Sequence, residues 1–381
     1  MKKFVLMVVV TAVTLVGAFS FIPKIKTPSV TKKDDISIPS ESTENNNLLA
    51  KMTLEEKIGQ MMIVSYRKPE MDEELKNMLT VVKPGGFIFF SENFSNYDKT
   101  MVLINSIKDT ANVPLFLAID QEGGRVQRLK TMSGITVKNI PSMSEIGKTN
   151  SEDIAYQVGV DIANDLKKMG FNLDFAPVMD VNSNSKNTVI GNRSFGTDPY
   201  LVAKMGLSLD RGLSDNEIIP TYKHFPGHGD TVADSHVELP IINKTKEELM
   251  RIELVPFVEA IKNNADMIMI GHLAVPNITG NYKPASLSYE VITNLLKNEL
   301  GYKNLVITDA LNMKAITDNY TEKEIYELAI NAGVDILLMP SDPIKAVSII
   351  KELINEGKVK EEKINNSVRK ILELKERYNI I

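Results

Sequence analysis

The amino-acid sequence predicts an α/β fold, a single (β/α)8 TIM-type barrel that occupies residues 48–381. Short apolar runs alternate with amphipathic segments about eight times, as expected for repeated strand–helix units. Most runs are apolar on both faces, which is typical of strands buried in a parallel sheet. Nearly all end in a polar or ionisable residue, and barrel active sites are built at the carboxyl ends of the strands. The runs cover residues 59–64, 86–90, 114–120, 171–177, 218–224, 266–272, 304–309 and 335–340.

The first 47 residues are expected to lie outside the barrel. Met1-Lys2-Lys3 is positively charged, and residues 4–22 are uninterrupted apolar or small residues, which is the pattern of a secretory signal peptide. Because this stretch approaches the ~20 residues that span a bilayer, residues 1–22 are expected to be either a signal peptide or a membrane anchor. Residues 23–47, rich in Lys, Ser, Thr, Pro and Asn, are expected to form a flexible tether. The barrel should therefore be extracytoplasmic, either secreted or membrane-anchored at the cell wall.

Helix signals lie between the apolar runs. Two Thr-x-x-Glu capping boxes, Thr53 with Glu56 and Thr245 with Glu248, predict helix starts, and the second helix should run toward residue 263. Residues 288–299 form another predicted helix, which Gly301 ends. A terminal helix is predicted from apolar residues at helical spacing. These residues are Ile364, Val368 and Ile371.

An open, doubly wound sheet is the alternative to the barrel. Such a sheet would carry a glycine-rich phosphate-binding turn after an early strand. The chain offers only the pair Gly123-Gly124, followed by Arg-Val-Gln, so the barrel is favoured.

Composition excludes several classes of function. The net charge of −5 and the lack of a basic stripe interleaved with aromatic residues argue against a nucleic-acid partner. The absence of cysteine removes disulfides, thiolate nucleophiles and Cys-ligated zinc. No cofactor and no metal are expected.

The densest group of ionisable residues lies in a loop after the run at 218–224. Residues 223–236 read Lys-His-Phe-Pro-Gly-His-Gly-Asp-Thr-Val-Ala-Asp-Ser-His and hold three of the chain's four histidines. Proline and glycine exclude a helix here. Histidine transfers protons near neutral pH, so this loop is a candidate for acid–base chemistry.

Asp309 is the candidate nucleophile. It directly follows an apolar run, although aspartate in such a place also serves as a helix N-cap. Glycoside hydrolysis needs a carboxylate and a proton donor. In that reaction Asp309 would attack the anomeric carbon, while His236 would protonate the leaving oxygen and later activate water. Asp234 would orient His236 and raise its basicity.

Two further segments carry candidate sugar-binding residues. Asp120 ends the run at 114–120, and Arg128 follows in Asp-Gln-Glu-Gly-Gly-Arg-Val-Gln-Arg. A carboxylate can hold vicinal hydroxyls and a guanidinium can bind others, although an exposed salt bridge is the simpler interpretation. Arg193 lies in a Gly- and Asn-rich loop at 192–196 and could bring another guanidinium to the same site.

These motifs together resemble the bacterial β-N-acetylhexosaminidases, or β-N-acetylglucosaminidases, of glycoside hydrolase family 3. The resemblance covers residues 52–378 and begins with Met-Thr-Leu-Glu-Glu-Lys-Ile-Gly-Gln. In the family, the Asp-Ser-His segment matched here by residues 234–236 separates N-acetylglucosaminidases from β-glucosidases. The motifs stand in the family's order at residues 52–60, 120–128, 192–196, 223–236 and 308–313.

The resemblance implies a retaining, exo-acting enzyme with Asp309 as nucleophile and the pair Asp234–His236 as acid/base. It also implies contacts to the N-acetylglucosamine (GlcNAc) in the −1 subsite from Asp120, Arg128, Arg193, Lys223 and His224. Expected substrates are peptidoglycan fragments that join GlcNAc to N-acetylmuramic acid (MurNAc), or chitooligosaccharides. Some relatives carry a second α/β domain after the barrel, whereas this chain is expected to hold the barrel alone.

Three alternatives remain. Phosphate could replace water as the acceptor, which would make the enzyme a phosphorylase. A metal-dependent hydrolase would use His224, His228 and His236 together with Asp230 and Asp234. Two histidines at i and i+4 share a face only in a helix, however, and residues 225–227, Phe-Pro-Gly, exclude a helix here. A non-catalytic wall-binding protein on the same barrel is disfavoured because both the nucleophile and the Asp–His pair are present.

Overall fold

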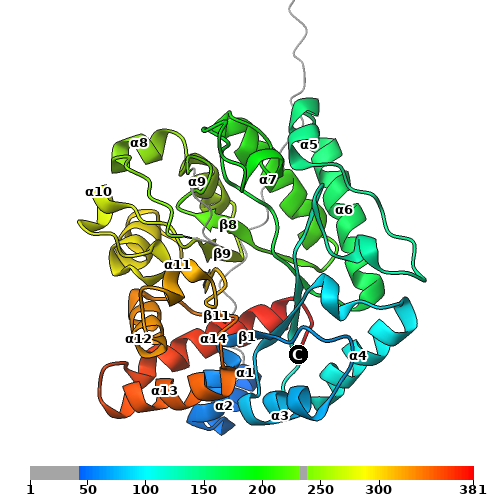
Figure 1. Ribbon diagram of the computed structural model, residues 1–381, viewed down its shortest axis with the longest axis vertical. Coiled ribbons are helices and arrows are strands. Elements are labelled where there is room, and N and C mark those ends of the chain that lie inside the picture. Colours follow the sequence, from blue (N-terminus) through cyan, green and yellow to red (C-terminus); the bar gives the residue numbers. More distant parts are fainter. Residues whose placement is uncertain (1–42, 232–237) are drawn as a thin grey trace, which may run out of the picture. The chain divides into compact units, whose positions relative to one another are not determined.

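The computed structural model describes residues 43–231 and 238–381, in which helices surround a curled, parallel β-sheet (Figure 1). The predicted α/β class is confirmed. The strands are β1 (Met62–Ser65), β2 (Gly86–Phe89), β3 (Phe116–Ile119), β4 (Gln121–Gly123), β5 (Val126–Gln127), β6 (Leu173–Asp174), β7 (Ile219–Pro220), β8 (Tyr222–Phe225), β9 (Met267–Ile270), β10 (Leu305–Thr308) and β11 (Leu337–Leu338).

The parallel strands form two groups that are continuous along the chain through β7 and β8. Six strands follow the order β11-β1-β2-β3-β6-β7, and three follow the order β10-β9-β8. Only Thr221 separates β7 from β8, so the run expected at 218–224 is present as two short strands. An isolated parallel bridge between Ile307 and Ile336 connects β10 to the residue before β11. Because the strands are parallel, their carboxyl ends all meet on one side of the sheet.

The other predicted strands lie within a few residues of their expected places. The first run was placed too early, because α2 continues to Gln60 and β1 begins only at Met62. Every residue of β2, β3, β9 and β10 is buried, as the apolar runs predicted. The hairpin β4–β5 was not predicted, since its strands are short and its turn holds Gly123 and Gly124, both with positive φ.

The helices are α1 (Thr43–Lys51), α2 (Leu54–Gln60), α3 (Glu73–Val82), α4 (Tyr97–Thr110), α5 (Met143–Thr149), α6 (Glu152–Met169), α7 (Pro199–Ser214), α8 (Lys246–Arg251), α9 (Val255–Lys262), α10 (Pro276–Thr279), α11 (Lys314–Thr317), α12 (Glu322–Ala332), α13 (Pro343–Asn355) and α14 (Glu361–Arg377). A π-helix, η5, covers Glu290–Glu299, and short 3-10 turns are η1 (Ser91–Asn93), η2 (Leu129–Thr131), η3 (Gly191–Arg193) and η4 (Ala285–Leu287).

The helix predictions are largely confirmed. Both predicted capping boxes are formed, at the starts of α2 and α8. The helix expected over 245–263 is two helices, because the chain leaves helical geometry at Ile252 before Pro256 enters the first turn of α9. The predicted apolar face of α14 is buried along its length.

The boundary between tether and barrel needs correction. Residues 43–47 were expected in a flexible tether, but they form the first turns of α1. The Asn45 side chain donates to Glu376 in α14, which ties this helix to the end of the chain. Residues 1–42, which include the expected signal or anchor segment, lie outside the described residues. Within the described part of the chain, no helix is long and apolar enough to cross a membrane.

The helices α2 and α14 meet around a buried lysine. Lys375 of α14 donates to the Gln60 side chain at 3.0 Å and lies 5.0 Å from the centre of the Phe116 ring. Burial lowers the pKa of Lys375 to about 7. This contact holds α14 against α2 and against the strand β3.

Candidate active site

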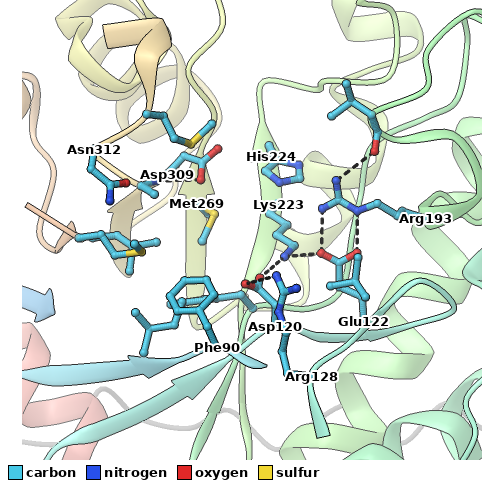
Figure 2. Close-up of a pocket in the computed structure, with 18 of the residues that line it drawn as sticks. Phe90, Asp120, Glu122, Arg128, Arg193, Lys223, His224, Met269, Asp309 and Asn312 are labelled. Atoms are coloured by element: carbon cyan, nitrogen blue, oxygen red, sulfur yellow. Dashed lines mark hydrogen bonds and ion pairs between the residues drawn. The ribbon is translucent and has the colours of Figure 1, made fainter. Parts of the chain in front are cut away.

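A pocket of about 260 Å³ lies where the strands end (Figure 2). Several predicted residues line it from one side, and Asp309 lines it from the other. Its volume is near the lower limit of the ~300–1,000 Å³ common for small-molecule sites, which suits one sugar unit better than a chain of sugars. The predicted residues in its lining are Asp120, Arg128, Arg193, Lys223, His224 and Asp309.

Asp120 is held by two cations. It directly follows β3, and its Oδ1 accepts from Lys223 Nζ at 2.8 Å. Its Oδ2 accepts from Arg128 Nη2 at 3.4 Å. Lys223 reaches it from β8, so strand geometry alone brings together two residues far apart in the sequence.

Glu122, which was not predicted, forms the centre of the cluster. The Arg193 guanidinium binds it with two parallel hydrogen bonds, 2.7 Å from Nε to Oε2 and 2.8 Å from Nη2 to Oε1. Lys223 pairs with the same carboxylate. Burial alone would raise the pKa of Glu122, but these two cations hold it well below its ordinary value. Lys223 shows the same competition. Burial lowers its pKa, but the carboxylates of Asp120 and Glu122 outweigh burial and raise the pKa above its ordinary value.

A buried carboxyl group with a raised pKa lies next to this cluster. Asp174, at the end of β6, is fully buried, and its Oδ1 accepts from the Gln121 backbone N–H at 2.9 Å. Burial raises the pKa of Asp174 to about 8, with a further contribution from Asp120 and Glu122. The fold therefore favours the neutral form of Asp174.

Asp180 fixes the start of the histidine-rich loop. Its Oδ2 lies 2.7 Å from His224 Nδ1, and its Oδ1 accepts from the His228 backbone N–H at 2.6 Å. Burial would raise the pKa of Asp180, but the two histidines hold it below its ordinary value. The pKa of His228 is lowered by burial and by His224. His224 is therefore oriented by one nitrogen, which leaves Nε2 as the ring atom that can meet a ligand.

Both flanks of the loop are anchored. Asn187 donates to the His228 carbonyl at 2.7 Å, and the Thr231 hydroxyl lies 2.7 Å from His228 Nδ1. Beyond the loop, Lys244 pairs with Asp230 at 3.3 Å. The predicted acid/base residues Asp234 and His236 lie between these anchors, outside the described residues.

Asp309 faces the binding cluster across the pocket (Figure 2). It follows β10, is half-buried, and its Oδ1 accepts from the Ala310 N–H at 2.8 Å. The buried His272 contacts the next peptide group, with Nε2 2.9 Å from the Ala310 carbonyl. Asp309 is thus not an N-cap of a following helix, because the next helix, α11, begins only at Lys314 and has no side-chain cap.

Sequence reasoning missed Glu122 and Asp180. A signal for Asp180 was available, because it comes shortly after the run at 171–177 and so obeys the strand-end rule. Glu122 lies only two residues beyond Asp120, but no sequence pattern near it indicates that it pairs with Arg193.

The described residues contain no group of three or more His, Cys, Asp or Glu side chains arranged to hold a metal ion. The metal-dependent alternative requires His236, which is outside that part of the chain. Of its other ligands, His224 is bound to Asp180 and His228 is bound to Thr231.

Comparison with known proteins identifies relatives. Residues 53–374 match the family described as "Glycosyl hydrolase family 3 N terminal domain". The chain is 32% identical over 365 residues to a β-hexosaminidase A of Pseudoalteromonas piscicida, covering 85% of this chain and 61% of that protein. It is 35% identical over 291 residues to a β-hexosaminidase of Tolumonas auensis, covering 75% of this chain and 84% of that protein.

The same kinship is visible in three dimensions. A glycoside hydrolase family 3 β-N-acetylglucosaminidase from Paenibacillus sp. str. FPU-7 has a TM-score of 0.82 and 37% sequence identity. This match covers 86% of the present chain and 63% of the Paenibacillus chain. The present chain thus spans less than two thirds of the length of two of these relatives.

Proposed function

The chain belongs to glycoside hydrolase family 3, and from this premise we propose that it is a retaining, exo-acting β-N-acetylglucosaminidase. Its proposed substrates are peptidoglycan fragments that end in GlcNAc, such as GlcNAc-MurNAc. The observation that carries the proposal is a pocket with room for one sugar unit, with Asp309 on one side and a hydrogen-bonding cluster on the other. Relatives named β-hexosaminidase and β-N-acetylglucosaminidase support it.

In the first step an Asp309 oxygen attacks the anomeric carbon, and the bond from that carbon to the leaving oxygen breaks. The leaving oxygen takes a proton from His236, and the sugar stays bound to Asp309 as an ester. The hydrogen bond from the Ala310 N–H to Oδ1 helps to hold the Asp309 carboxylate in position for this attack.

In the second step a water molecule loses a proton to His236 and attacks the same carbon, which releases GlcNAc and restores Asp309. Asp234 keeps the imidazole oriented throughout. A histidine suits this task because it is uncharged once it has given up its proton. It therefore does not repel the anionic nucleophile, as a second carboxylate would.

The ion-paired cluster binds the sugar. Asp120 is partly exposed to the pocket and can accept from sugar hydroxyls, while Lys223 and Arg128 hold it in place. His224 can donate or accept through Nε2 because Asp180 holds its other nitrogen. Arg193 acts mainly through Glu122, to which two of its nitrogens are already bound.

We propose that the enzyme acts outside the cytoplasm, because the first 22 residues have the pattern of an export signal or membrane anchor. Cell fractionation tests this. Recovery of the protein in the medium or on the outer side of the membrane supports export, and recovery with cytoplasmic markers contradicts it.

The decisive test of the activity is a comparison of hydrolysis rates between an aryl β-N-acetylglucosaminide and the matching β-glucoside. A strong preference for the N-acetyl sugar is expected. Equal rates, or preference for the glucoside, would contradict the assignment. Replacing the aryl glycoside by purified GlcNAc-MurNAc then tests the substrate, and added inorganic phosphate with detection of GlcNAc-1-phosphate distinguishes a phosphorylase.

A further inference from the structure

A second hollow, of about 470 Å³, lies at the opposite end of the strands from the active site. Its lining includes residues 333–335, which lead into β11, and residues of η5 and α14. Because β11 runs parallel to its neighbours, the hollow is at the amino ends of the strands. Nothing in the proposed glycosidase reaction uses this end of the barrel.

The hollow is strongly cationic. Four basic side chains line it, and Asp335 is the only carboxylate in its described lining. Two of the cations, Lys297 and Lys370, have their Nζ atoms 3.6 Å from Asp335, which is too long for a hydrogen bond. Asp335 instead accepts from the Ser367 hydroxyl at 2.9 Å and from the Val306 N–H at 3.0 Å. The basic side chains are Lys297, Lys363, Arg369 and Lys370.

Capping of a helix end explains part of this charge. Lys297 donates to the Gly333 carbonyl, and Lys363 donates to the Asn331 carbonyl at 3.1 Å. Both carbonyls belong to the carboxyl end of α12, where positive charge is favourable. This role uses one hydrogen of each ammonium group, and an ammonium has three.

Capping does not explain the other two cations, Arg369 and Lys370, which both lie on α14. Arg369 bonds to Asn366 through Nη1, but its Nε is buried and has no acceptor in the described structure. Lys370 lies 3.5 Å from the Asn304 carbonyl and forms an ion pair with Asp335 at 3.6 Å. Burial lowers the pKa of Lys297, Asp335 opposes this by raising it, and Lys370 and Lys363 lower it further. In the described lining of the hollow, one carboxylate thus faces four cations.

We propose that this hollow binds a phosphate group. The four cations come from two helical segments, Lys297 from η5 and the other three from α14. A phosphate offers more oxygens than a carboxylate and matches donors that converge from several sides. An inorganic phosphate or a phosphodiester of an anionic polymer would provide this chemistry. Because the hollow is at the far end of the barrel, binding there would leave the sugar pocket open.

The test is isothermal titration of the full chain with inorganic phosphate at low ionic strength. The double variant Arg369→Gln/Lys370→Gln is expected to bind phosphate about ten-fold more weakly or worse, since charge-assisted hydrogen bonds are lost. Lys262→Gln, which removes an exposed lysine on α9, is the matched control and should bind as the parent does. Lys370→Gln alone provides a milder variant if the double variant is unstable.

Hydrolysis of the aryl glycoside by the double variant should be unchanged, so failure of this proposal is separate from failure of the proposed function. A parallel titration with a poly(glycerol phosphate) distinguishes the two sources. Tighter binding of the polymer, lost in the same variant, indicates a polymer ligand, and equal binding indicates free phosphate. No binding of phosphate, or binding unaffected by either variant, would overturn the proposal.

Discussion

The two sides of the sugar pocket are built differently. On one side Asp120, Glu122, Arg193 and Lys223, here called the ion-paired wall, are cross-linked by charge-assisted hydrogen bonds. On the other side Asp309 is half-buried, and it accepts a backbone hydrogen bond from the Ala310 N–H. Cross-linked charges are held rigid because each one loses its partners if it moves. The nucleophile, in contrast, has to change its bonding during the reaction.

This difference predicts that substitutions on the two sides will have different consequences. Changes to the ion-paired wall should reduce both stability and substrate binding. Changes at Asp309 should reduce turnover and leave stability nearly unchanged. The predictions below test this separation.

Asp309→Asn should have the largest effect, a loss of turnover on the order of 10⁴-fold or more, because an amide cannot form the glycosyl ester. The melting temperature should change little, since Asp309 is only half-buried and asparagine keeps an oxygen that can accept from the Ala310 N–H. Initial rates with an aryl β-N-acetylglucosaminide and a thermal scan measure the two quantities. Asp318→Asn, which changes an exposed aspartate after α11, is the control. Turnover near that of the control would mean that Asp309 is not the nucleophile.

His236→Ala should reduce turnover by ~10²–10⁴-fold, the usual contribution of a general acid/base. The loss should be smaller for substrates with a good leaving group, because these need less help from a proton donor in the first step. Comparing a nitrophenyl glycoside with a disaccharide measures this. An equal loss on both substrates would indicate that His236 only supports the structure.

Glu122→Gln should test the ion-paired wall directly. Removing this charge leaves Arg193 and Lys223 without their shared partner, which should cost ~3–5 kcal/mol of unfolding free energy and raise KM. Glu92→Gln is the matched control, since Glu92 also pairs with an arginine at 2.7 Å but is about half exposed. The control should lose no more than ~1 kcal/mol. Similar losses in both variants would refute the special role of the wall.

The Glu122→Gln variant should also change how the unfolding free energy depends on pH in the acidic range. Folding lowers the pKa of Glu122 below its ordinary value of 4.5, so its ion pairs stabilise the fold above that pH and are lost as the pH falls. The difference between parent and Glu122→Gln should therefore shrink in acid. A difference in urea-unfolding free energy that stays constant down to low pH would contradict this.

Asp174→Asn should have the smallest effect on activity and a distinct effect on stability. Folding raises the pKa of Asp174 from 3.8 to about 8, so the neutral form is favoured and its advantage is lost as the pH rises through that range. Asparagine keeps the acceptor for the Gln121 N–H without the charge. As the pH rises from acid to mildly alkaline values, the unfolding free energy of the variant should increase by at least ~1 kcal/mol relative to that of the parent. Parallel unfolding free energies of the two proteins across this range would show that Asp174 is already ionised.

Much of the fold could be predicted because burial on both faces leaves a strong pattern. The fully apolar strands β2, β3, β9 and β10 were placed within two residues of their ends. The hairpin β4–β5 and helix α1 lack such a pattern. The helix α1 is mostly polar and is stabilised from afar, through the contact between Asn45 and Glu376, which no local sequence pattern could reveal.

The residues of the candidate site likewise fall into those that could be predicted from the sequence and those that could not. Asp120, Lys223, His224 and Asp309 could be predicted because they end strands, and parallel strands bring their ends together. Glu122 could not, because its importance depends on Arg193, about 70 residues away along the chain. The strand-end rule finds residues that face the pocket, whereas the residues that hold them in place depend on pairings formed only in the fold.

The pairing of β1 with β11 has a consequence for how the protein is made. Met62, in the first strand, lies beside Leu337, in the last, and α14 then packs against α1 and α2. A growing chain therefore cannot complete this sheet until β11 has left the ribosome, and one edge of β1 stays unpaired until then. For a protein that we propose to be exported, this late completion favours passage through a narrow secretion channel before folding. Assembly of the enzyme would then be delayed until it has reached the compartment where its substrates are.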